Sequence, residues 1–85
     1  MKYDLSKPIT RGAKRTLDAL SSAMFFLLSG KSFEEITVGA LCEQAQYPRA
    51  TFYNYFDDKY DLLNYCWLSL AEKIGLSEYH YAPEN

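Results

Sequence analysis

Cysteine and histidine are scarce in this sequence, and their scarcity argues against several kinds of site. There are two cysteines, Cys42 and Cys66, and one histidine, His80, with no CxxC pair and no cluster of the two residue types. A zinc site is therefore not supported, and we expect both cysteines to be buried free thiols in a reducing compartment. His80 has no nucleophile or ligand partner near it in the sequence, so we expect it to be a solvated residue.

Catalytic signatures and long hydrophobic runs are also lacking. The four glycines form no phosphate-binding loop, and no paired carboxylates or Ser/His/Asp grouping indicate an active site. We therefore expect no enzyme activity and no cofactor. The longest uninterrupted apolar run, residues 23–28, has six residues, against the roughly 20 that span a bilayer. The sequence thus predicts a cytoplasmic protein with no secretory or membrane segment.

Hydrophobic residues, at 48%, and aromatic residues, at 16%, are plentiful enough for one small folded domain of 85 residues. The net charge of −2 is unevenly spread. Residues 1–16 carry five basic residues and one acid, whereas residues 57–85 carry two basic residues and six acids. A basic N-terminal arm is compatible with nucleic-acid binding, although domains with that role are often basic overall. Solubility is the alternative explanation of the arm.

The spacing of the apolar residues predicts an all-α fold. A first long helix begins at a Thr10 cap and ends before Gly30, which we expect at the C′ position. Its core-facing apolar residues are spaced three or four apart: Ile9, Ala13, Leu17, Leu20, Met24 and Leu27. Phe25 and Leu28 widen this apolar face near the end of the helix, and Phe26 lies at its edge. Residues 31–36 are expected to be a connector whose Phe33 and Ile36 close the base of the core.

Two short helices follow in a helix-turn-helix arrangement. Residues 37–45 form the first, with Thr37 as a plausible N-cap and apolar residues at helical spacing. Tyr47-Pro48 breaks that pattern, and the next helix runs from Pro48 to Phe56, because proline fits the first helical position. Phe52 and Phe56, four residues apart, share a buried face.

A fourth helix is predicted from Asp58 to about Ile74, with Gly75 as its terminator. Asp57 and Asp58 supply its cap, and Asp61 adds a carboxylate to its first turn. Its apolar residues are too many for one face, so this helix is expected to be buried on more than one side.

The polar side chains of residues 48–56 can donate to phosphates or bases, and from this pattern alone DNA binding and a plain helical bundle with exposed aromatics are equally good interpretations. The string TFYNYF at 51–56 resembles the N-terminal domain of the TetR family. The resemblance extends to residues after the string, Lys59 and Asp61-Leu62-Leu63, and to residues before it, Thr37-Val38, Leu41, Ala45 and Arg49-Ala50. Gly30-Lys31-Ser32-Phe33 and Ile36 resemble that family's link between its first two helices. The match covers roughly residues 10–65.

The resemblance implies a transcriptional regulator whose recognition helix enters the major groove of double-stranded DNA. It implies a homodimer on a palindromic operator, and a small-molecule effector bound by a further domain that we expect to lie outside this chain. The expected DNA-contacting residues are Thr37, Arg49, Ala50, Thr51, Tyr53, Asn54, Tyr55 and Lys59. Arg11 and Lys14 are expected to contact the phosphate backbone of the DNA nearby. Arg49 is expected to read a guanine and Ala50 a thymine methyl group, and the remainder mainly phosphates.

The expected organisation is a flexible basic arm (1–9), a DNA-binding domain (10–57), a connecting helix (58–75) and a tail (76–85). The chain departs from the family at three positions: Gln46 replaces a glycine, Pro48 a hydroxyl residue, and Gly39 a base-reading side chain. The loss of the turn glycine, Gly39 and the acidic total favour a second hypothesis. In it, the chain is a protein-interaction or co-regulator module that keeps the fold with little DNA affinity.

Overall fold

The computed structural model describes residues 10–73, which contain four α-helices, one 3-10 turn and no strand. The predicted all-α fold is confirmed. The elements are α1 (Arg11–Leu28), η1 (Phe33–Glu35), α2 (Val38–Ala45), α3 (Arg49–Tyr55) and α4 (Lys59–Lys73). The expected arm (1–9), Ile9, Ile74, Gly75 and the tail with His80 lie outside the described residues.

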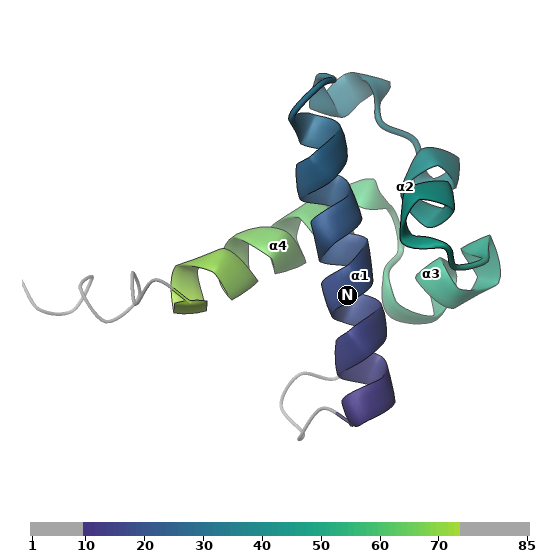
Figure 1. Cartoon of the computed structure of the whole chain (residues 1–85), viewed down its shortest axis with the longest axis vertical. Helices are drawn as coiled ribbons and strands as arrows, with labels where there is room; N and C mark the ends of the chain where they lie inside the picture. The colour runs from purple at the N-terminus through teal and green to yellow at the C-terminus, as the bar shows by residue number, and fades with distance from the viewer. Residues whose placement is uncertain (1–9, 74–85) are drawn as a thin grey trace, which may run out of the picture.

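Helix α1 is the element on which the others are assembled (Figure 1). Helix α1 packs against both α2 and α4, and α2 in turn packs against α3. Figure 1 shows α2 and α3 together on one side of α1, while α4 crosses α1 and extends away on the other side. The two short helices thus form one face of the molecule, and α4 leads away from it.

The core confirms the predicted stripes. The largest fully buried side chains come from every helix and from the connector: Leu17, Leu20, Met24, Ile36, Leu41, Phe52, Phe56, Leu62 and Cys66. Burying one large apolar side chain contributes about 1.5–3 kcal/mol. Phe52 and Phe56 pack with ring centroids 5.4 Å apart, so the inner face of α3 is fixed by two aromatic anchors.

Three predicted helix caps are present. The hydroxyl of Thr10 accepts from the backbone N–H of Ala13 at 3.1 Å, and the hydroxyl of Thr37 accepts from that of Ala40 at 3.0 Å. The Asp58 carboxylate accepts from the Asp61 backbone N–H at 2.9 Å. Each cap satisfies a first-turn donor that has no partner inside its helix.

Two boundaries and one core residue differ from the prediction. Pro48 and Asp58 precede α3 and α4, rather than opening them; the extended ψ of 157° at Pro48 makes it the N-cap of α3. Phe25, expected in the α1 stripe, is 45% exposed. Leu17, Leu20 and Met24 set the buried face, and Phe25 is rotated by about 100° from Met24 on a helix of 3.6 residues per turn.

The turn between α2 and α3 contains a left-handed residue. Gln46 has φ 65° and ψ 41°, and its backbone N–H donates to the end of α2. This is the position where the family resemblance expects glycine, so the turn keeps the glycine conformation with a residue that has a Cβ. Holding a non-glycine residue there costs about 1–2 kcal/mol.

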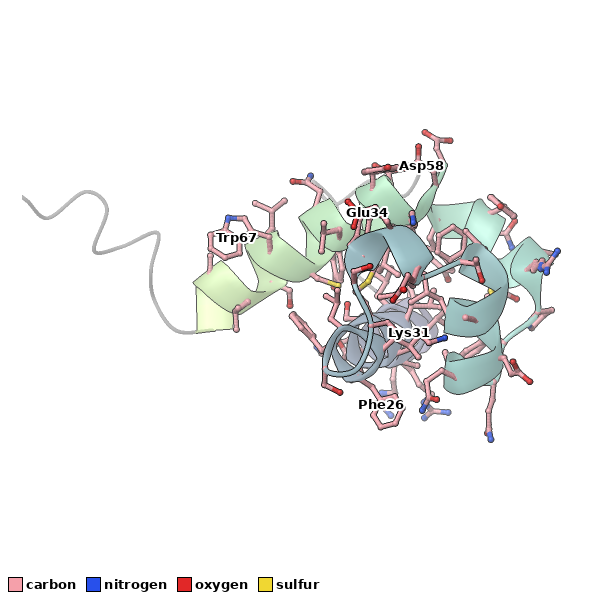
Figure 2. All side chains as sticks on the ribbon, turned by 90° about the horizontal axis from the view of Figure 1, so that it is seen from above. Phe26, Lys31, Glu34, Asp58 and Trp67 are labelled. Atoms are coloured by element: carbon pink, nitrogen blue, oxygen red, sulfur yellow. The ribbon has the colours of Figure 1, made fainter. Side chains whose placement is uncertain are left out.

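Helix α4 was expected to be buried on more than one side, and in the described residues only one side is buried. Leu62 and Cys66 are buried, whereas Trp67 and Leu68 are 59% and 53% exposed. In Figure 2, Trp67 points away from the rest of the molecule. None of the helices in residues 10–73 is long and apolar enough to cross a membrane.

Candidate nucleic-acid interface

Helix α3 has an inner face of aromatic anchors and an outer face of polar side chains. Phe52 is fully buried in α3 and Phe56 directly after it, while Arg49, Ala50 and Asn54 are exposed. Thr51 is half-buried. The helix therefore presents a guanidinium, a methyl group and an amide to solvent, from a backbone that its two phenylalanines hold in place.

The two tyrosines of α3 lie at the edge of that outer face. Tyr53 is 42% exposed, and its ring meets that of Phe52 edge to face, with centroids 5.2 Å apart. Tyr55 is half-buried against the core. Each ring is thus packed on one side, which limits the directions in which its hydroxyl can point.

The beginnings of α2 and α3 meet. The Arg49 guanidinium lies directly over Gly39, the second residue of α2. Thr37, the residue before α2, is exposed; its oxygen accepts the capping hydrogen bond, which leaves the hydroxyl proton able to donate to a ligand. Sequence reasoning noted Gly39 only as a missing side chain. A glycine inside a helical pattern was the signal available for its contact with Arg49.

Lys59, which is expected to contact a phosphate, is bound to backbone carbonyls of the connector in this structure. Its ammonium donates to the carbonyl oxygens of Phe33 at 2.8 Å, Glu34 at 3.3 Å and Ile36 at 2.8 Å, and lies 4.6 Å from the centre of the Phe33 ring. An ammonium has three donors, and all three are used. In this conformation Lys59 joins the connector to α4.

Arg11 and Lys14 are exposed on the first turns of α1. Lys14 pairs with Asp18 at 3.2 Å, and both side chains are largely exposed. An exposed pair of this kind contributes about 0.5 kcal/mol or less. Both cations are therefore free to reorient toward a phosphate.

The cysteines are buried free thiols, as predicted. Burial raises the pKa of both thiols, and at Cys42 the nearby charge of Arg49 opposes that rise. Fewer thiolates at neutral pH mean lower reactivity. Within residues 10–73, no three His, Cys, Asp or Glu side chains come together to hold a metal ion.

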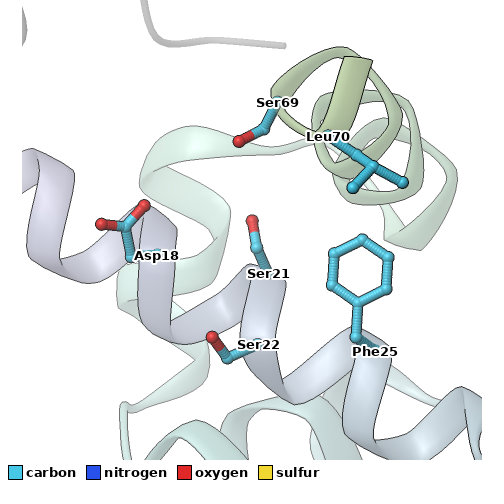
Figure 3. Close-up of a pocket in the computed structure, with 6 residues that line it drawn as sticks. All are labelled: Asp18, Ser21, Ser22, Phe25, Ser69 and Leu70. Atoms are coloured by element: carbon cyan, nitrogen blue, oxygen red, sulfur yellow. The ribbon is translucent and has the colours of Figure 1, made fainter. Parts of the chain in front are cut away.

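A small pocket of about 80 Å³ lies between α1 and α4, away from the α2 and α3 surface. Figure 3 shows Phe25 of α1 and Leu70 of α4 on one side of it, and Asp18 and Ser69 on the other. The Ser21 hydroxyl beside it is buried and lies next to the Cys66 thiol of α4.

Comparison with known proteins identifies the arrangement. Searches of curated proteins and of solved structures give no match. A family model described as bacterial regulatory proteins, tetR family, matches residues 22–66, which is just over half of the chain. The matched residues run from the middle of α1 through α2 and α3 into α4. The chain therefore belongs to the TetR family, and its helix-turn-helix is the DNA-binding head of a transcriptional regulator.

Proposed function

We propose that the chain binds double-stranded DNA sequence-specifically by inserting α3 into the major groove. The observation that carries this proposal is the two-sided character of α3: Phe52 is fully buried, while Arg49, Ala50 and Asn54 are exposed. The major groove admits an α-helix, and each base pair displays a distinct pattern of donors and acceptors there.

Each exposed group matches a kind of contact. The fork of the Arg49 guanidinium fits the O6 and N7 acceptors of guanine, and the Ala50 methyl fits that of thymine. Asn54 can bond either a base or the backbone. Thr51, Tyr53 and Tyr55 can donate to phosphates beside the groove, and so can Thr37 at the start of α2. Arg11 and Lys14 would hold the backbone further along. Lys59 would reach a phosphate only by leaving its three carbonyls.

The resemblance to the family extends the proposal to the whole regulator. Two heads of a homodimer would read the half-sites of a palindromic operator. A small-molecule effector, bound by a domain that follows the fourth helix in this family, would change the spacing of the heads through α4. The exposed apolar residues Trp67 and Leu68 on α4 support contact with further protein.

A titration of the 85-residue chain with a short DNA duplex, followed by amide-resolved NMR, tests the proposal. We expect shifts clustered on residues 37–56 and on the start of α1, decreasing as salt is raised, because phosphate contacts release counterions. The Arg49→Ala/Tyr53→Ala variant should keep a folded spectrum and lose these shifts. DNA binding that survives the double substitution would contradict the proposed site.

The second candidate function is a protein-interaction or co-regulator module, and the exposed Trp67, Leu68 and Leu70 of α4 favour it. It predicts no shifts on α2 and α3 when DNA is added. Changes confined to α4 in the same titration would support this function in place of DNA binding.

A further inference from the structure

Gly39 and Arg49 form a contact that only glycine permits. A Cβ at position 39 would lie 2.6 Å from Nη2 of Arg49, 3.4 Å from Cζ and 3.5 Å from Nε. The first distance is well inside van der Waals contact. The guanidinium therefore occupies the volume in which any other residue at position 39 would place its side chain.

The backbone of α2 does not itself require glycine at this position. Gly39 is an ordinary helical residue without a positive φ, and glycine inside a helix costs stability relative to alanine. Gly12 in α1 provides a comparison, because a Cβ there would meet nothing within 4 Å. What distinguishes Gly39 is the guanidinium that lies against it.

Among residues 10–73, Arg49 has no hydrogen bond or ion pair, and the group on which its charge acts is the buried thiol of Cys42. The start of α2 is moreover the positive end of a helix dipole, which does not attract a cation. The space above Gly39 is therefore what admits the guanidinium to this position, and its donors remain available to an acceptor outside the protein.

We propose that Gly39 is a specificity-determining residue, which leaves room for the Arg49 guanidinium over α2 and thereby fixes the base step that Arg49 reads. This inference rests on the proposed function of α3. A side chain at position 39 would displace the flexible end of Arg49 without disturbing the helices. The preferred base pair at one position of each half-site would then change, while the contacts between the protein and the DNA phosphates would be kept.

The test begins with a selection of DNA-binding sites from randomised duplexes. The selection itself identifies the operator sequence that the wild-type protein prefers. The selected duplex is then titrated with the wild type, Gly39→Ala, Arg49→Ala, the double variant Gly39→Ala/Arg49→Ala, and the control Gly12→Ala. Thermal unfolding of each variant is measured alongside. Gly39→Ala and Gly12→Ala should both unfold at or above the wild-type temperature, since alanine favours a helix.

We expect Gly39→Ala to weaken binding of the selected duplex about tenfold, in line with the loss of one bidentate base contact, and to change the preferred base at one position of each half-site. In the Arg49→Ala background the same substitution should have no effect. Gly12→Ala should bind as the wild type does.

Two outcomes overturn the inference alone: Gly39→Ala with unchanged affinity and base preference, or an equal loss in both backgrounds, which would show that Gly39 acts independently of Arg49. A wild-type protein that enriches no sequence would overturn the proposed function and this inference together. The two failures are therefore distinguishable.

Discussion

Gln46 shows how a single residue can keep a turn at a cost in stability. The turn from α2 to α3 needs a left-handed residue, and Gln46 provides it at φ 65°. The sequence raised this possibility, because the family resemblance expects glycine there. The arrangement of Arg49 over Gly39 was not predictable in the same way, since it depends on where two separate helices meet.

Replacing Gln46 with glycine is expected to stabilise the protein by about 0.5–1 kcal/mol. The strain of a left-handed non-glycine residue is relieved, and part of the gain is offset by the greater freedom of glycine in the unfolded chain. Urea unfolding measures the change. Gln44→Gly, two residues earlier inside α2, is the matched control and should lose about 1 kcal/mol. A loss of stability in both variants would contradict the assignment of strain to Gln46.

At the scale of the elements, local signals predicted most of what the structure contains. Thr10, Thr37 and Asp58 cap the helices they were expected to cap, because capping depends on residues within one turn. The 3-10 turn Phe33–Glu35 was predicted only as a connector. The lysine that holds this turn lies 23 to 26 residues further along the chain, so no local pattern could reveal it.

The tie between η1 and α4 gives a prediction about Lys59. Lys59→Met should lower the free energy of unfolding by about 1.5–3 kcal/mol. The substitution removes a charged donor, so the partly buried carbonyl oxygens of Phe33 and Ile36 lose the hydrogen bonds that they accept from it. Lys14→Met is the control, since it removes only an exposed pair with Asp18, and should change stability by about 0.5 kcal/mol or less. Equal effects of the two substitutions in urea unfolding would refute a structural role for Lys59.

At the scale of the whole molecule, the charge is distributed so that an acidic chain keeps basic residues near its beginning. The net charge is −2 and the isoelectric point about 5.2, yet Arg11, Lys14 and Arg15 follow one another on the exposed start of α1. Composition revealed this unevenness. It did not reveal that α1 packs against α2 and α4 while these three cations stay exposed.

Arg11 is therefore expected to contribute to DNA affinity without contributing to sequence preference. Arg11→Ala should weaken binding to all duplexes alike and reduce the slope of log affinity against log salt by about 0.9, the value for one phosphate contact in duplex DNA. Fluorescence anisotropy at several salt concentrations measures the slope. An Arg11→Ala variant with the wild-type slope, or with an altered base preference, would show that Arg11 does not bind a phosphate.

The uneven burial along α4 has a mechanical consequence. Its fully buried residues, Leu62 and Cys66, lie in the first half of the helix, and the residues after them, Trp67 and Leu68, are mostly exposed. From Cys66, the last fully buried residue of α4, to Lys73 the helix extends about 10 Å at 1.5 Å per residue. With Cys66 as the pivot, a sideways displacement of about 3 Å at Lys73 corresponds to a rotation of about 16° on this length. Under the proposed function, helix α4 would act as a lever arm, which converts a small displacement at one end into an angular change of the head at the other.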